Sequence, residues 1–159
     1  MITVAIIGAG PGLGAAVARR FGAEGFSVAL VGRSREKLDK LAGDLPGVDA
    51  RGFVADVRDT GALGAALDRA ADELGPVEVL QYSPLPQKEF LRPVLETTVD
   101  DLKAAVEFSI LGPVTAVQQV VPGAITPGHP THDPDVLAER LWQMHTSRGE
   151  FRVFAEPLP

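Results

Sequence analysis

Residues 6–15 are Ile6-Ile7-Gly8-Ala9-Gly10-Pro11-Gly12-Leu13-Gly14-Ala15, and they join a short apolar run, residues 2–7, to a segment with helical spacing. Glycines at such a junction let the backbone approach a phosphate group, because no Cβ stands in the way. The first N–H groups of the following helix, together with its dipole, favour an anion at the same place. The junction therefore predicts a loop that cradles the phosphates of a nucleotide.

The glycines of this loop fit three spacings. Gly8, Gly12 and Gly14 form G-x-x-x-G-x-G, whereas Gly10, Gly12 and Ala15 form the commoner dinucleotide spacing G-x-G-x-x-A. The third spacing, G-x-G-x-G from Gly8, is similar to the cofactor loop of S-adenosylmethionine methyltransferases, which usually need a carboxylate after the second strand. We favour the first, because it places Gly8 directly after the strand and starts the helix near Gly12.

Apolar runs that suit strands alternate with helical patterns along most of the chain. Strands are expected at 2–7, 27–31, 53–55 and 77–80, and a capping box at 98–101 is expected to open a long helix that Gly112-Pro113 bends. This alternation is typical of right-handed βαβ units around a parallel sheet. We expect an α/β fold of the Rossmann type, a doubly wound parallel sheet that is incomplete after the fourth strand and the long helix.

Length and charge restrict the class of protein. The 159 residues, 45% of them apolar, suit a single dinucleotide-binding domain over residues 1–159. A net charge of −6, with 15 basic residues scattered along the chain, argues against nucleic acid or a membrane as the main partner. The N-terminal apolar run has no basic region before it, and no run has the length of a membrane span, so we expect a cytoplasmic location.

Metal and thiol chemistry are not expected. The chain has no cysteine, which excludes disulfides, thiolate metal sites and a cysteine nucleophile. The sequence His129-x-x-His132-Asp133, with His145 later, lies in a proline-rich segment, and loop polarity and helix capping explain it better than a metal does. The sequence therefore predicts no metal site.

The end of the second strand distinguishes between cofactors. A carboxylate there would accept hydrogen bonds from a ribose diol, but the chain has Gly32-Arg33-Ser34-Arg35 and no acid before Glu36. An arginine at this corner suits a ribose 2′-phosphate, through a charge-assisted contact. We therefore expect Arg33 and Ser34 to favour NADP(H) over NAD(H).

The glycine motif, Arg33, Asp56-Val57 and the segment 90–121 together resemble the short-chain dehydrogenase/reductase family, over about the first three-quarters of the chain. The resemblance implies cofactor contacts by Asp56, which would accept from the adenine amino group, and by the backbone of Val57. Where the family usually has Asn-Asn-Ala-Gly, this chain has Gln81-Tyr82-Ser83-Pro84, and Ser109 stands at the position of a helix asparagine of the catalytic site. The resemblance implies these cofactor-binding residues: Gly8, Gly12, Leu13, Gly14, Arg33, Ser34, Asp56, Val57, Ser83, Ile125 and Thr126.

The catalytic pair of this family is absent. Its chemistry uses a tyrosine as acid and base and a lysine four residues later, but Tyr82 is the only tyrosine and Pro86 follows at that distance. Pro122-Gly123-Ala124-Ile125-Thr126 resembles the family's loop after the sixth strand, yet it follows the long helix directly. Two strand–helix units, about 60 residues, are thus expected to be missing between about residues 120 and 123.

Two explanations of this gap remain open. The chain is either a shortened record of a longer reductase or a truncated relative that kept cofactor binding and lost catalysis. We expect an NADP(H)-binding oxidoreductase that transfers hydride to or from a carbonyl or alcohol if the catalytic segment exists in the natural protein. The alternatives are a non-catalytic dinucleotide-binding or sensor module and, more distantly, a methyltransferase. The resemblance also implies a homo-oligomer, because the long helix pairs subunits in the relatives.

Overall fold

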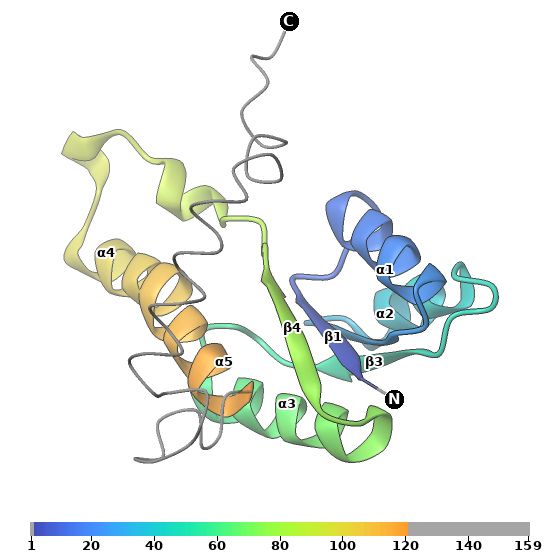
Figure 1. Ribbon diagram of the computed structural model, residues 1–159. Helices are drawn as coiled ribbons and strands as arrows, with labels where there is room; N and C mark the ends of the chain where they lie inside the picture. Colours follow the sequence, from blue (N-terminus) through green and yellow to red (C-terminus); the bar gives the residue numbers. More distant parts are fainter. Residues whose placement is uncertain (1, 121–159) are drawn as a thin grey trace, which may run out of the picture. The chain divides into compact units, whose positions relative to one another are not determined.

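The computed structural model describes residues 2–120, in which strands and α-helices alternate (Figure 1). The strands are β1 (Thr3–Ile7), β2 (Ser27–Gly32), β3 (Ala50–Val54) and β4 (Val77–Tyr82). The α-helices are α1 (Leu13–Ala23), α2 (Arg35–Gly43), α3 (Thr60–Leu74), α4 (Val99–Val106) and α5 (Gly112–Val120). Short 3-10 turns at Lys88–Leu91 and Val94–Glu96 precede α4, and a π-helical turn, Glu107–Leu111, joins α4 to α5.

The four strands form one parallel sheet in the order β3-β2-β1-β4. The chain first moves outward from β1 to β3 and then returns to the other side of β1 to form β4. The strand order therefore reverses beside β1, and in open α/β sheets ligands bind at the carboxyl ends of the strands at such a point. The predicted Rossmann-type parallel sheet is confirmed. The third and fourth strands differ in extent from the prediction, since β3 begins at Ala50 and β4 continues to Tyr82.

Alternate residues of the central strands face two separate cores. On one face of the sheet, even-numbered residues of β1 and β2 pack against α1 and α2; this core holds Val4, Ile6, Val28, Leu30, Leu38 and Leu41. On the other face, odd-numbered residues pack against α3 and α5; this core holds Ala5, Ile7, Ala29, Val31, Leu63, Leu67 and Ala116. Burial on both faces explains why β1 and β2 are continuous apolar runs rather than alternating ones. Figure 1 shows α1 and α2 on one side of the sheet and α3 and α5 on the other.

The buried face of α1 matches the helical pattern in the sequence only in part, since Val17 and Phe21 pack against the core as partly buried side chains. Leu13, Val17 and Phe21 lie on one face by spacing, but Leu13 is 64% exposed, and the buried residues of α1 are Gly14, Ala15 and Ala18. A Cβ on Gly14 would lie 3.2 Å from the Cα of Ala9 and 3.4 Å from Cγ2 of Ile6. The start of α1 therefore lies so close to β1 and its loop that only small side chains fit between them.

The long helix begins and changes as the sequence predicts. Thr98 and Asp101 form the capping box that opens α4, with the Thr98 N–H donating to Asp101 and the Asp101 N–H to the Thr98 hydroxyl. The expected irregularity at Gly112 is the π-helical turn just before it. Along the outer face of α4, this turn and α5 runs a stripe of apolar side chains between 44% and 68% exposed: Val99, Leu102, Val106, Ile110, Val114 and Val117.

Several predictions concern residues outside 2–120. Residues outside 2–120 are part of the predicted single domain over 1–159 and of the predicted gap near 120–123. The same residues contain the predicted loop with Ile125 and Thr126 and the histidines from His129 onward. Within the described residues, no helix has the length and hydropathy to cross a membrane. The same residues contain no cluster of three or more acidic or histidine side chains suited to a metal ion.

Candidate functional site

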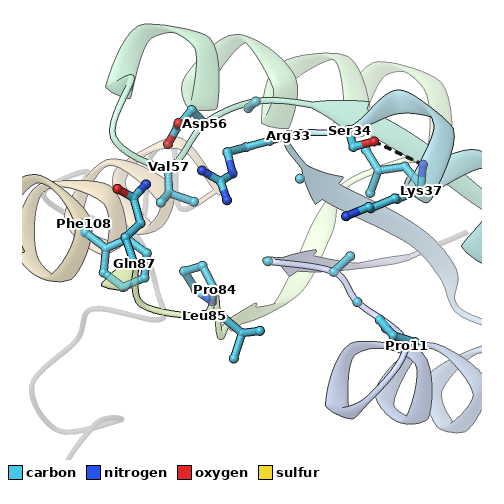
Figure 2. A pocket seen from close by; sticks show the side chains of 16 residues that line it. Pro11, Arg33, Ser34, Lys37, Asp56, Val57, Pro84, Leu85, Gln87 and Phe108 are labelled. Carbon is cyan, nitrogen blue, oxygen red and sulfur yellow. Dashed lines mark hydrogen bonds between the residues drawn. The ribbon is translucent and has the colours of Figure 1, made fainter. Parts of the chain in front are cut away.

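A cleft of about 580 Å³ lies at the carboxyl ends of all four strands (Figure 2). Residues at and after the strand ends line it: 8–11 after β1, Gly32 at the end of β2 with Arg33 and Ser34 after it, 55–57 after β3, and Pro84, Leu85 and Gln87 after β4. Lys37 and Leu38 of α2, and Phe108 of the π-helical turn, complete the lining. The volume suits a ligand of cofactor size.

Gly8 is the residue of the glycine motif whose backbone most requires glycine. Its φ is +84°, and its N–H donates to the carbonyl of Val31 over 2.9 Å. A Cβ at Gly8 would lie 2.3 Å from the Cα of Pro84 and 2.4 Å from its nitrogen. The loops after β1 and β4 are therefore in direct backbone contact, and this contact forms the floor of the cleft.

The other residues of the motif have different surroundings. Gly12 immediately precedes α1, is exposed, and has no atom within 4 Å of where a Cβ would stand. Leu13 is the exposed first residue of α1, and Gly14 is buried against Ala9. These three residues do not line the cleft, which is bordered instead by Gly8, Ala9, Gly10 and Pro11. The start of α1 therefore adjoins the cleft at its glycine side.

The side of the cleft formed by the residues after β2 is basic. Figure 2 shows the Arg33 side chain extending over the cleft, with Ser34 and Lys37 beside it on the turn into α2. Ser34 caps α2, since its hydroxyl oxygen accepts from the Lys37 N–H over 3.4 Å. The cap fixes the start of the helix, and Lys37 stands one helical turn after Arg33. Two cations thus border the cleft where the second strand ends.

Asp56 and Val57 follow β3 and line the cleft. Asp56 is half-buried, and its carboxylate accepts from the N–H of Arg58 over 3.0 Å, which closes an Asx turn. Val57 is buried. The Arg58 side chain pairs with Glu107 of the π-helical turn, with both the Nε and the Nη2 contacts at 2.9 Å. The turn after β3 is therefore fixed both within itself and against the long helix.

The remaining predicted residues lie around the cleft or outside the described chain. The Ser83 N–H donates to the Ile7 carbonyl over 2.9 Å and its hydroxyl accepts from Gln81, but the cleft is lined by Pro84 rather than by Ser83. Ser109 is exposed on the π-helical turn and does not line the cleft. Ile125 and Thr126 lie outside residues 2–120, so the structure does not place them.

The lining residues that the sequence analysis missed include Lys37, Pro84, Gln87 and Phe108. Lys37 could have been found from its position in the first turn of a helix whose cap is Ser34, one turn after Arg33. Pro84 could not, because its role is a backbone contact with Gly8, which is distant in sequence. Gln87 lies in the proline-rich loop directly after the fourth strand, and this position at the carboxyl end of a strand could have indicated it. Phe108 comes from a helical segment with no local pattern that points to the cleft.

Tyr82 ends β4 next to the cleft but is not among its lining residues. It is half-buried, and its hydroxyl donates to the backbone carbonyl of Phe108 over 2.6 Å. Burial, followed by the negative charge of Asp56, raises the pKa of Tyr82 above its ordinary value of 10.0. The phenol therefore stays protonated and serves as a hydrogen-bond donor at neutral pH.

Comparisons with known proteins agree with the fold. The family model for short chain dehydrogenases matches residues 2–129. Meso-2,3-butanediol dehydrogenase of Serratia marcescens is 36% identical over 119 residues, which are 75% of this chain and 47% of that protein. The chain thus spans about half the length of this relative.

Solved structures give the same result. A blue fluorescent protein from a metagenomic library, in complex with NADPH, is similar with a TM-score of 0.65 and 28% identity, over 74% of this chain and 49% of that one. A variant of actinorhodin polyketide ketoreductase with NADPH has a TM-score of 0.67 and 28% identity, over 76% of this chain and 46% of that one. From the family match over most of its length and the parallel sheet with its cleft, we conclude that this chain belongs to the short-chain dehydrogenase family.

Proposed function

We propose that the cleft binds NADP(H) in preference to NAD(H). The observation that carries this proposal is the basic corner after β2, where Arg33 and Lys37 border the cleft beside Ser34 and no carboxylate stands among its lining residues on that side. A 2′-phosphate there would be neutralised by two cations, and the Arg33 guanidinium can contact it through two N–H groups. The NADPH complexes of the two similar structures support the same choice.

The other lining residues fit the rest of a dinucleotide. The loop after β1, from Gly8 to Gly14, would hold the pyrophosphate at the start of α1, where backbone N–H groups and the helix dipole favour an anion. Asp56 and the Val57 backbone would hold the adenine ring, and Ser83 would lie toward the ribose. Asp56 is suited to accept from the adenine amino group, because its carboxylate is held by the Arg58 N–H and borders the cleft.

As a member of its family, the whole protein is proposed to be an oxidoreductase of small carbonyl or alcohol compounds. The bound cofactor supplies the hydride for this chemistry. The residues of this chain bind and orient its adenosine half, whereas a Tyr-x-x-x-Lys pair, which would transfer the proton, occurs nowhere in the 159 residues. Since the chain spans about half of the similar dehydrogenase, we propose that the proton-transfer residues belong to the remaining part of the longer family fold. The cytoplasmic location stays a prediction.

The cofactor preference is tested by titrating NADPH and NADH into the wild type, Arg33→Ala and Arg19→Ala. Arg19 is an exposed arginine of α1 that does not line the cleft, so its variant controls for the loss of one positive charge. A lost charge-assisted hydrogen bond is worth about 1.5–3 kcal/mol, so Arg33→Ala should weaken NADPH binding about 10- to 100-fold. NADH binding should stay within about twofold of the wild type. Equal losses for the two cofactors would contradict the proposal.

The second candidate is a non-catalytic dinucleotide-binding or sensor module. It is favoured by one observation, the absence of the catalytic Tyr/Lys pair from a chain that retains the cleft. NADPH binding by the 159-residue chain, together with no reductase activity on a panel of ketones and aldehydes when the full reading frame is expressed, would support the sensor. The family assignment argues against the methyltransferase alternative.

We also propose that the protein is a homo-oligomer paired through the long helix. The apolar stripe supports this, because Leu102 and Ile110 are 57% and 54% exposed at positions a helix partner would cover. Sedimentation should give a dimer or larger species for the wild type and a shift toward monomer for Ile110→Gln. Leu95→Gln is the control, since Leu95 is 97% exposed but lies off the stripe. A monomeric wild type would contradict this proposal.

A further inference from the structure

Tyr82 connects the end of β4 to the π-helical turn. Its hydroxyl donates to the Phe108 carbonyl over 2.6 Å, in the turn where the hydrogen-bonding pattern of the long helix changes. A π turn alters the usual i→i−4 ladder, and a side-chain donor can then serve a carbonyl within it. The tyrosine thus holds a specific backbone atom of a segment 26 residues away.

The long helix lies close to Tyr82 at Gly112, which has no Cβ. A Cβ on Gly112 would lie 2.5 Å from the Tyr82 hydroxyl oxygen and 2.8 Å from the carbonyl oxygen of Val57. Gly112 is buried, and it is the first residue of α5. Three segments therefore meet at this point: the end of β4, the turn after β3, and the long helix.

Phe108 is the residue through which this junction reaches the cleft. Its side chain lines the cleft together with Asp56 and Val57, and Figure 2 shows it on the side opposite Pro11. Its ring also packs against that of Phe90, with the ring centroids 5.3 Å apart. The Arg58–Glu107 ion pair connects the same turn after β3 to the residue before Phe108. Fixing the Phe108 backbone therefore fixes one wall of the cleft.

We propose that Tyr82 is a positioning residue of the nucleotide cleft, whose hydroxyl holds the π-helical turn so that Phe108 forms the wall of the adenine pocket beside Asp56 and Val57. The proposal rests on the proposed NADP(H) binding for the identity of the ligand. In this proposal Tyr82 acts through Phe108, because its hydroxyl donates to the Phe108 carbonyl and its own side chain is not among those that line the cleft. The tyrosine stands where, by the family resemblance, an asparagine is usual.

The test compares Tyr82→Phe with Thr3→Val, each of which removes one hydroxyl that donates to a backbone carbonyl. Thr3 donates to Leu74 over 3.0 Å at the amino end of β1, at the opposite end of the sheet from the cleft. Binding of adenosine 2′,5′-bisphosphate, which carries only the adenosine half of NADP, is measured by calorimetry. Tyr82→Phe should weaken it about three- to tenfold, the equivalent of one hydrogen bond, whereas Thr3→Val should stay within about twofold of the wild type. Binding by Tyr82→Phe as tight as that of the wild type would overturn the proposal.

A double-mutant cycle with Phe108→Leu shows whether the effect passes through Phe108. In the Phe108→Leu background, Tyr82→Phe should cause a further change of less than about twofold. A further loss as large as in the wild-type background would overturn the proposal, because Tyr82 would then act by another route.

Amide hydrogen exchange tests the holding of the turn without any ligand. Peptides that cover residues 106–114 should exchange faster in Tyr82→Phe than in the wild type. In Thr3→Val, the exchange of these peptides should equal that of the wild type. If the wild type binds no bisphosphate, the proposed function fails, and the exchange result still decides the role of Tyr82. Unchanged exchange in Tyr82→Phe would overturn that role.

Discussion

Replacing Gly8 by alanine should destabilise the fold far more than the same change at Gly25, although both glycines have left-handed backbones. The φ angles are +84° at Gly8 and +86° at Gly25. The surroundings differ, since a Cβ at Gly25 meets no atom within 4 Å, whereas a Cβ at Gly8 would lie 2.3 Å from the Cα of Pro84. Gly25→Ala therefore measures the cost of the backbone conformation alone, and the difference between the two variants measures the contact with Pro84.

The magnitudes follow from these distances. An L-residue in the left-handed region costs about 1–2 kcal/mol, which is the whole expected effect of Gly25→Ala. Carbon atoms in contact stand about 3.5–4.0 Å apart, so Gly8→Ala must also move the backbone of Pro84 by about 1 Å or more. Overpacking of this kind costs about 1–3 kcal/mol, which gives about 2–5 kcal/mol in total for Gly8→Ala.

Urea denaturation followed by far-ultraviolet circular dichroism gives both free energies of unfolding, and NADPH titration gives the affinities. Gly8→Ala should also weaken NADPH binding, because Gly8 and Pro84 both line the cleft, while Gly25→Ala should not. Equal destabilisation by the two substitutions would contradict a tight contact between Gly8 and Pro84, because the loop after β4 would then move aside at no cost. Unchanged NADPH affinity in a folded Gly8→Ala protein would contradict the proposal that NADPH binds beside Gly8 and Pro84.

Three further predictions concern the rest of the described chain. The raised pKa of Tyr82 means that the folded state holds the phenolic proton more tightly than the unfolded chain does. The resulting contribution to stability is complete below pH 10.0 and is lost as the pH rises through the raised pKa. Because Tyr82 is the only tyrosine, its ionisation can be followed by near-ultraviolet absorbance. Thr98→Ala removes the capping box of α4 and should cost about 0.5–2 kcal/mol in urea denaturation, with helix loss seen by circular dichroism. Leu63→Ala, at a side chain that is 0% exposed between α3 and the sheet, should cost about 2–5 kcal/mol; a loss below 1 kcal/mol, about that of a surface change, would contradict the assigned core.

The sequence predicts the elements well where local patterns decide them. The structure has the predicted apolar strands β1 and β2 and the capping box at Thr98, each of which rests on residues adjacent in sequence. The parallel sheet followed from the alternation of strands and helices, because that alternation is typical of right-handed βαβ units, whereas the order of the strands comes from the structure. The basic corner at Arg33 was also local, since it depends only on the residues directly after the second strand.

The residues that sequence reasoning missed depend on contacts between distant segments. The spacing of Leu13 with Val17 and Phe21 indicated an apolar face, and Val17 and Phe21 do pack against the core as partly buried side chains. The close approach of α1 to the sheet makes Gly14, Ala15 and Ala18 the fully buried residues and leaves Leu13 exposed. The hydrogen bond from Tyr82 to Phe108 could not be predicted, because nothing in a strand end specifies which carbonyl of a later helix will face it. The spacing of apolar residues in the sequence indicates the faces of a helix. The distance between the helix and the sheet then decides which of its side chains are fully buried.

The backbone contact between Gly8 and Pro84 also determines the order in which the cleft can form. The glycine motif is complete within the first 14 residues, and the βαβ unit of β1, α1 and β2 depends only on contacts that are short in sequence. The floor of the cleft is complete only after β4 has paired beside β1, which closes a much longer loop and is therefore the slower event. During synthesis, a nascent chain that has emerged only as far as β3 carries the whole motif without the floor beneath it. A nucleotide that binds this cleft would stabilise the state in which β4, the last strand of the described sheet, has paired with β1. It could not stabilise the earlier pairing of β1 with β2, because the cleft is not yet complete at that stage.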